Sequence, residues 1–214
     1  ELAAAGVDTG AVQHDAGLPT TQKYVLVDPA GEVMVLGAAG ANAGFDPAGL
    51  PQGWPRGLLR LHLTSQRPAT ASRLAATASA AEVPVSIDPG RRIGTDAPGA
   101  MAAAAVVFLN DREAALAVDV APTPTRSVIV KHGPAGAELR TATGRITHPG
   151  FPAVATDTTG AGDAFAAGYL AATLRGAAPE RRLAVANACG AIAAGAAGGR
   201  PQLEWSAIER HLRS

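Results

Sequence analysis

The sequence is poor in cysteine, in aromatic residues and in net charge, and each shortage excludes a class of protein. Its single cysteine, Cys189, excludes an intramolecular disulfide framework and a zinc site built from several cysteines. Lys plus Arg equal Asp plus Glu at 18 each, so no net field attracts a nucleic acid or an anionic membrane. No apolar run reaches the roughly 20 residues that span a bilayer, and the first residues do not resemble a signal peptide. We therefore expect a cytoplasmic protein with a small-molecule partner.

The residues that are abundant favour an α/β enzyme. Apolar residues make up 47% of the chain and aromatics only 4%, and alanine dominates the apolar set. Helices of this composition pack closely through small side chains around an aliphatic core. The 214 residues are enough for one domain with a single core. The chain starts at Glu1 rather than Met, and residues 1–6 are typical of a helix end closed by Gly6, so we expect that a segment upstream is missing.

The hydrophobic pattern predicts a hairpin followed by alternating strands and helices. Residues 23–27 and 32–36 flank the turn sequence Asp28-Pro29-Ala30-Gly31, and residues 37–57 are expected to form a loop with one helical turn. From Leu58 onward, continuous Val, Ile and Leu runs indicate strands that are buried on both faces, hence a mainly parallel sheet sandwiched by helices. The predicted strands lie at 58–63, 83–87, 106–109 and 127–130, with a strand pair at 137–148, and the helices at 69–81, 98–105, 112–118, 163–175, 179–197 and 204–213.

One nine-residue segment, Asp157-Thr158-Thr159-Gly160-Ala161-Gly162-Asp163-Ala164-Phe165, predicts an anion site at the start of a helix. Gly160 and Gly162 allow the backbone to approach a ligand, and the helix directs its unpaired N–H groups and positive dipole end at that place. Asp163 lies in the same turn, where its carboxylate could take a proton from an attacking hydroxyl. Taken alone, a Gly-x-Gly-Asp string also fits an ordinary N-capped helix with Asp163 near its positive end.

The whole segment resembles the C-terminal signature of the ribokinase-like (PfkB) family of carbohydrate kinases, and the resemblance extends from about Gly6 to Pro201. It implies that Asp163 is the catalytic base and that the N–H groups of Gly160, Ala161 and Gly162 hold the transferring phosphoryl group. The fold that it implies is a ribokinase-like α/β domain over residues 1–214, without its N-terminal third, with part of a small β lid at about 20–37. Lids of this kind often also form a dimer contact, so the resemblance implies a homodimer.

Further stretches match the family in order along the chain, and they imply the nucleotide and metal contacts. Asn110 and Glu113 match an Asn-x-x-Glu motif associated with Mg²⁺ and phosphate, partly through water, although the same two residues also fit a capping box. The nucleotide-binding residues implied are Asn110, Glu113, Lys131, Gly133, Gly136 and Asn187, the last of these beside the adenine. Gly133 and Gly136 equally suit a simple hairpin turn.

A monovalent cation such as K⁺ is implied at Asp157 and Thr159, together with carbonyl groups from about 194–199. A carboxylate, a hydroxyl and backbone carbonyls are the oxygen ligands that hard cations prefer.

The acceptor side is less complete. Asn42, after the hairpin, and Gln66, where related sequences carry Glu, are the candidate sugar-binding residues besides Asp163. Fructokinase-like members have Asp-x-Asn-x-Arg at the segment starting with Asp88, whereas this chain has Gly90 at the Asn position; Arg91 suits either an anion clamp or a solvated strand end.

The resemblance therefore implies transfer of the γ-phosphoryl group of Mg·ATP to a hydroxymethyl group of a sugar. The alternatives are a nucleoside kinase of the same family and a truncated, inactive nucleotide-binding remnant. The N-terminal third, which we expect to precede this sequence, would separate the sugar kinase from the nucleoside kinase.

Overall fold

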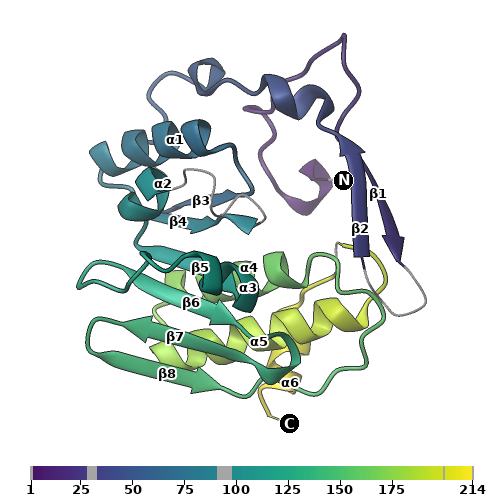
Figure 1. Cartoon of the computed structure of the whole chain (residues 1–214), viewed down its shortest axis with the longest axis vertical. Coiled ribbons are helices and arrows are strands. Elements are labelled where there is room, and N and C mark those ends of the chain that lie inside the picture. Colours follow the sequence, from purple (N-terminus) through teal and green to yellow (C-terminus); the bar gives the residue numbers. More distant parts are fainter. Residues whose placement is uncertain (1, 28–32, 91–97, 200, 214) are drawn as a thin grey trace. The chain divides into compact units, whose positions relative to one another are not determined.

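The computed structural model describes residues 2–27, 33–90, 98–199 and 201–213, and divides the chain into two compact units, Glu1–Trp54 and Pro55–Ser214 (Figure 1). Each unit is described separately. No helix among the described residues is long and apolar enough to cross a membrane.

The first unit contains the predicted hairpin. Strands β1 (Gln22–Val27) and β2 (Val33–Ala38) pair antiparallel, with Gln22 opposite Ala38. Three short 3₁₀ turns accompany them: η1 (Ala3–Ala5), η2 (Gly40–Gly44) and η3 (Pro47–Gly49). The segment 37–57 thus holds two helical turns rather than the one expected. Gly6 closes η1 in the left-handed conformation with φ 79°, as the sequence predicted for a helix end. The predicted turn at 28–31 lies outside the described residues.

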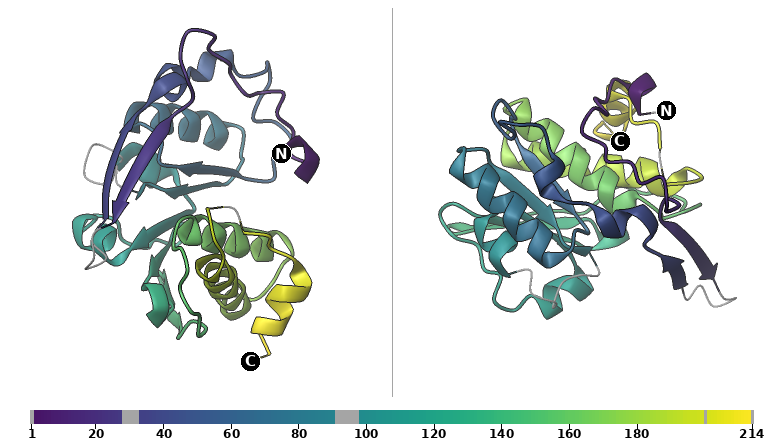
Figure 2. Two further views of the ribbon diagram at one scale, coloured as in Figure 1. Left: turned by 90° about the vertical axis from the view of Figure 1, so that its right-hand side faces the viewer. Right: turned by 90° about the horizontal axis from the view of Figure 1, so that it is seen from above.

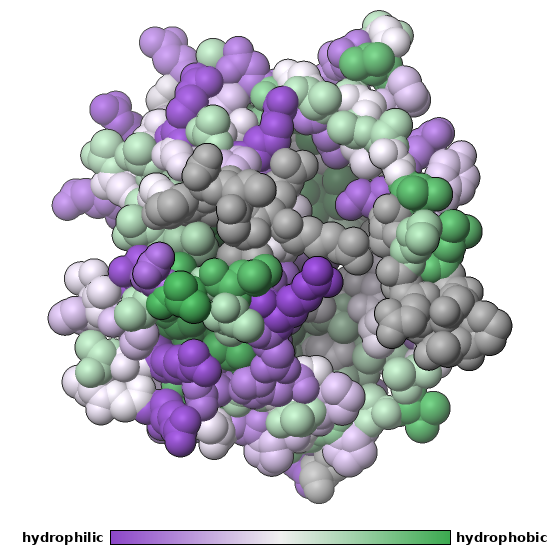
Figure 3. Space-filling model, viewed as in Figure 1, coloured by the Kyte–Doolittle hydropathy of each residue, from purple (hydrophilic) through white to green (hydrophobic). Residues whose placement is uncertain are grey.

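One face of the hairpin is apolar and exposed. Tyr24 is paired with Leu36, and Leu26 with Met34, so these four side chains lie on the same face of the two strands. All four are more than half exposed, and apolar side chains are visible over β1 and β2 at the right edge of Figure 3. A two-stranded ribbon is only marginally stable alone. This face therefore suits burial against another surface.

The second unit is built on a six-stranded sheet among the described residues, in the order β3-β4-β5-β6-β7-β8. Strands β3 to β6 are parallel, and β7 and β8 continue the sheet antiparallel. The mainly parallel sheet confirms the predicted fold class. The strands are β3 (Leu61–Thr64), β4 (Val85–Asp88), β5 (Val106–Asn110), β6 (Ser127–Lys131), β7 (Ala137–Thr141) and β8 (Gly144–His148).

Helices cover both faces of this sheet, as Figures 1 and 2 show. Helices α4 and α5 pack on one face, whereas α1, α2 and α3 lie on the other. The helices are α1 (Pro68–Ala80), α2 (Pro98–Ala103), α3 (Asp111–Leu116), α4 (Ala161–Leu174), α5 (Pro179–Gly195) and α6 (Trp205–His211).

Helix α4 is fixed by aromatic contacts on one side and by a close helix contact on the other. The ring of Phe108 on β5 lies edge-on to Phe165 and Tyr169 of α4, with centroids 6.4 and 5.7 Å away. Gly168 faces α5 so closely that an added Cβ would lie 2.6 Å from Cys189 Sγ. Burial raises the pKa of Cys189 to about 11, so this thiol stays protonated and serves as packing.

This topology gathers polar residues at one edge of the second unit. The carboxyl ends of parallel strands meet at the same edge, and open α/β folds bind ligands there. Thr64 lies opposite Asp88, and Asn110 lies opposite Lys131, at the ends of their strands. Four successive strand ends therefore face the same region.

Candidate active site

The first turn of α4 has the geometry that an anion site requires. Gly160 caps the helix in the left-handed conformation with φ 78°, and a Cβ there would lie 2.5 Å from the carbonyl oxygen of Gly199. The first helical hydrogen bond runs from Ala164 N to Gly160 O, at 2.8 Å, and Ala161 N donates to Thr158 O at 3.2 Å. The N–H groups of a first helical turn carry the positive end of the helix dipole. Glycine is needed at 160 for conformation and for space.

Asp163 lies within this turn and is exposed, which the predicted role as a base requires. On β3, the imidazole of His62 lies edge-on to Phe108 and makes a 3.0 Å hydrogen bond with Ser86 Oγ. Burial lowers the pKa of His62, and the negative charges of Asp88 and Asp163 oppose that shift. The negative charges of Asp88 and Asp163 therefore both favour the protonated form of the same part-buried imidazole ring.

Lys131 and Asp88 form an ion pair at this edge. Lys131 Nζ lies 2.5 Å from Asp88 Oδ2, and the two side chains are only 15% and 10% exposed. A Cβ on Gly162 would lie 3.3 Å from the same Nζ, so the ammonium group lies directly against the first turn of α4. Neither Asp88 nor His62 is among the site residues predicted from the sequence, although Asp88 begins the segment that was compared there with fructokinase-like members. Asp88 ends a continuously buried strand, but only the packing reveals its partner.

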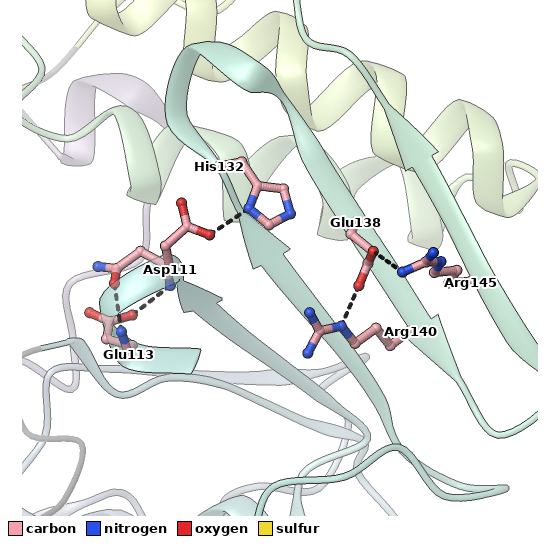
Figure 4. Close-up of polar contacts among 7 residues, drawn as sticks. Asp111, Glu113, His132, Glu138, Arg140 and Arg145 are labelled. Carbon is pink, nitrogen blue, oxygen red and sulfur yellow. Dashed lines mark hydrogen bonds and ion pairs between the residues drawn. The ribbon is translucent and has the colours of Figure 1, made fainter. Parts of the chain in front are cut away.

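Asn110 and Glu113 form a capping box at the start of α3. Asn110 Oδ1 accepts from Glu113 N at 2.8 Å, and Glu113 Oε2 accepts from Asn110 N at 2.9 Å (Figure 4). The capping interpretation is thus correct, and Glu113 is buried. Next to it, Asp111 Oδ1 lies 2.5 Å from His132 Nδ1, which ties α3 to the loop after β6.

The segment from Lys131 to Gly136 connects β6 to β7 through the 3₁₀ turn η5 (Gly133–Ala135) and is a hairpin connection. Gly136, with φ 93°, packs so tightly on β8 that a Cβ would lie 1.9 Å from His148 O. Beyond it, Glu138 binds Arg140 and Arg145 (Figure 4), and the hydrogen bond from Arg140 lowers the pKa of Glu138. The loop is held in a defined conformation, and its contact with a nucleotide stays a prediction.

Asn187 has an unsatisfied polar group. It lies on α5 and is only 7% exposed, and its Nδ2 has no hydrogen-bond partner among the described residues. A buried amide without a partner is unfavourable by about 1 to 3 kcal/mol. The unpaired donor is consistent with the predicted ligand contact.

The segments predicted to hold a monovalent cation lie side by side. Asp157 Oδ1 accepts from Thr159 N at 2.9 Å, and Oδ2 accepts from Gly198 N at 3.1 Å. Thr156 N donates to Ala194 O at 2.8 Å. Hydrogen bonds from Thr159, first from its side chain and then from its backbone, hold the pKa of Asp157 below its ordinary value. The carboxylate stays charged beside a loop rich in carbonyl groups.

Comparison with known proteins identifies the family. The family described as pfkB family carbohydrate kinase matches residues 1–206. The chain belongs to the pfkB family.

A curated relative, the ATP-dependent ribose-1-phosphate kinase of Halopiger xanaduensis, is 49% identical over an alignment of 219 residues that covers 99% of this chain and 74% of the relative. The nucleoside kinase of Methanocaldococcus jannaschii has a similar fold, with a TM-score of 0.86 and 20% identity over 99% of this chain and 74% of that one. The ribokinase of Thermotoga maritima aligns with a TM-score of 0.76 and 22% identity, over 92% of this chain and 71% of that one. Both structures support the fold assignment.

The residues present are compatible with Mg²⁺ bound to substrate phosphates. No group of three or more His, Cys, Asp or Glu that could hold a metal ion occurs in the part of the chain that the structure describes. Mg²⁺ usually keeps several waters and is bound by one or two carboxylates together with phosphates. Glu113 has one carboxylate oxygen in the capping box, which leaves the other for a water-mediated contact.

The predicted acceptor residues belong to both units. Gln66 is exposed and follows β3 at the same edge as Asp88. Its neighbour Ser65 has φ 49° and donates its N–H to Asp88 O at 3.0 Å, so this loop is anchored in a strained conformation typical of binding sites. Asn42 is exposed in η2 of the first unit, and Arg91 lies outside the described residues. Their roles in this pfkB kinase stay predictions.

Replacing Gly160 with alanine is expected to be more damaging than replacing Gly176. Both glycines have positive φ, 78° and 71°, but a Cβ at 176 meets nothing within 4 Å. Gly176→Ala should lower the free energy of unfolding by about 1 to 2 kcal/mol, which is the conformational cost alone. Gly160→Ala should cost a further 1 to 3 kcal/mol or so, because the methyl group displaces Gly199. Denaturant unfolding of both variants measures the difference, and equal losses would contradict the close approach of the two loops.

Proposed function

We propose that this pfkB kinase transfers the γ-phosphoryl group of ATP to the hydroxymethyl group of a sugar phosphate, with ribose-1-phosphate as the first candidate. The observation that carries the proposal is the first turn of α4, where Gly160 and Gly162 open the backbone and Asp163 is exposed within the same turn. The 49% identity to a ribose-1-phosphate kinase, over 99% of the chain, supports the donor and the acceptor class.

Asp163 acts as the base. The acceptor oxygen attacks the γ-phosphorus, and the proton of that hydroxyl passes to the Asp163 carboxylate. The bond between the γ-phosphorus and the bridging oxygen breaks, and its electron pair stays with ADP. Ribose-1-phosphate has a single hydroxymethyl group, so the product is a bisphosphate with the second ester on that carbon.

The rest of the site binds the donor. The N–H groups of Gly160, Ala161 and Gly162 hold the transferring phosphoryl group. Glu113 would hold a Mg²⁺ ion through water, and the ion would supply neutralisation of charge on the donor phosphates. Lys131, Gly133, Gly136 and Asn187 border the nucleotide, and the buried, unpaired Nδ2 of Asn187 supports its place there.

Gln66 fits an acceptor that already carries a phosphate. It is exposed at the edge of the site and is neutral. The glutamate that related sequences carry at this place would repel the phosphate group of the acceptor. Its amide can also bond sugar hydroxyls as donor and acceptor. Asn42 is assigned to the same acceptor.

The hairpin of β1 and β2 is assigned to a lid that also forms a dimer contact, because its face of Tyr24, Leu26, Met34 and Leu36 is apolar and exposed. Leu26→Glu places a charge in that face and is expected to convert a dimer to a monomer. Val25→Glu, on the opposite face, is the control and should leave the mass unchanged. Light scattering after gel filtration gives the masses; a wild-type monomer would refute the contact.

A K⁺ ion is assigned to Asp157, Thr159 and the carbonyl groups near 194–199, which would fix the loop contact behind Gly160. Exchanging K⁺ for tetramethylammonium at constant ionic strength is expected to lower kcat about tenfold, or about 1.4 kcal/mol of barrier. Steady-state rates in both salts check this. Identical rates in the two salts would show that the reaction does not depend on K⁺.

Asp163→Asn is expected to lower kcat by about 10² to 10⁴, the usual contribution of a general base, while ATP binding is retained. The assay is ADP release with Mg·ATP and a panel of ribose-1-phosphate, ribose, fructose and nucleosides. Asp119→Asn, which removes an exposed carboxylate elsewhere, is the matched control. Undiminished turnover in Asp163→Asn would contradict its assignment as the base. ADP release that only nucleosides stimulate would show that the acceptor is a nucleoside rather than a sugar phosphate.

A further inference from the structure

The ion pair of Lys131 and Asp88 spans the sheet below the anion-binding turn. The two residues end β6 and β4, with β5 between them. Strands lie about 4.8 Å apart, so the lysine side chain reaches across roughly 10 Å to its partner. Both side chains are largely shielded from water, at 15% and 10% exposure. An ammonium group held in this way has little freedom to sample other positions.

Asp88 is itself fixed by its neighbours. Its Oδ1 accepts from Gly90 N at 3.3 Å, while Oδ2 takes the lysine at 2.5 Å. Its backbone carbonyl accepts the N–H of Ser65 at 3.0 Å. Both carboxylate oxygens and the main chain therefore hold Asp88 in one orientation, which defines where Lys131 Nζ lies.

That position is against the turn that receives the transferring group. Nζ lies 3.3 Å from the point that a Cβ on Gly162 would occupy, and the proposed base is the next residue. An ammonium group has three N–H donors, so it can keep its bond to Asp88 and still donate to a phosphoryl oxygen. The pair is neutral as a whole, but its positive end is presented to the anion site.

We propose that Lys131 is a catalytic residue that binds the transferring phosphoryl group, and that Asp88 is a positioning residue that holds the ammonium group at the α4 turn. This rests on the proposed phosphoryl transfer at the same site. The contact of Lys131 is then stronger in the transition state than in the ground state with bound nucleotide. The reason is that the negative charge of the phosphoryl group is distributed differently in the two states. Asp88 acts only through Lys131.

The test separates binding of the ground state from binding of the transition state. ADP alone represents the bound nucleotide, and ADP with Mg²⁺ and aluminium fluoride represents the transferring phosphoryl group. Lys131→Met is expected to lower kcat by about 10² to 10³, as loss of a fixed electrostatic donor does, with similar loss of affinity for the ADP–aluminium fluoride complex. Its affinity for ADP alone should stay within about threefold of wild type, and Lys131→Arg should retain more activity because it keeps the charge.

Asp88→Asn and the double variant Asp88→Asn/Lys131→Met distinguish a positioning role of Asp88 from a structural one. Removing one partner of a buried ion pair leaves an uncompensated charge, whereas removing both does not, so the double variant should unfold at a higher temperature than Asp88→Asn. If the pair only stabilises the fold, the double variant should also recover kcat. We expect the double variant to stay as slow as Lys131→Met. Arg56→Met, at an exposed position, serves as the control for loss of a cation.

Two negative outcomes of this experiment have different consequences. A wild-type protein that phosphorylates no acceptor in the panel refutes the proposed function. A wild-type protein that is active, with Lys131→Met unchanged in kcat and in affinity for ADP–aluminium fluoride, leaves the function intact and overturns the role of Lys131.

Discussion

The packing of α4 against the sheet and against α5 is the constraint on which the site of the second unit depends. Phe108 holds the aromatic rings of α4 on one side, and Gly168 lets Cys189 of α5 approach on the other. Interiors packed at this density shift little, because every displacement loses contacts or creates overlaps. The first turn of α4 is consequently fixed with respect to the strand ends. A turn held in this way suits the proposed role of its N–H groups, because donors that are fixed in advance are the condition for electrostatic catalysis.

The parallel strands add to this turn a set of charges that balance one another. Asp88 and Lys131 come from the ends of different strands and pair across β5, beside Gly162. The capping box of Asn110 and Glu113 starts α3 at the same edge. These four residues thus each have a structural partner. Groups held in one arrangement lose less conformational entropy when a ligand binds.

The sequence was sufficient to predict what depends on local chemistry. The mainly parallel sheet followed from continuous apolar runs, and the kinase prediction followed from the segment 157–165; both are confirmed. The start of α4 was predicted two residues late, because the N-cap is a left-handed glycine, Gly160, rather than a side chain that accepts hydrogen bonds. Asn110 and Glu113 fitted a capping box on spacing alone, and they form one.

What could not be predicted depends on residues distant in sequence. Asp88 and Lys131 are 43 positions apart, and nothing in either segment indicates that one side chain reaches the other. The close approach of Gly199 to Gly160 was not predicted. The family resemblance implied only that carbonyl groups from about 194–199 bind a cation together with Asp157 and Thr159. Side-chain packing decides both contacts.

The most direct measurement of the central claim is a proton-coupled ³¹P NMR spectrum of the wild-type protein incubated with Mg·ATP and ribose-1-phosphate. The account predicts that the γ-phosphate signal of ATP is replaced by that of a new phosphate ester coupled to the two protons of the hydroxymethyl carbon. Release of inorganic phosphate alone, or an unchanged spectrum, would contradict it.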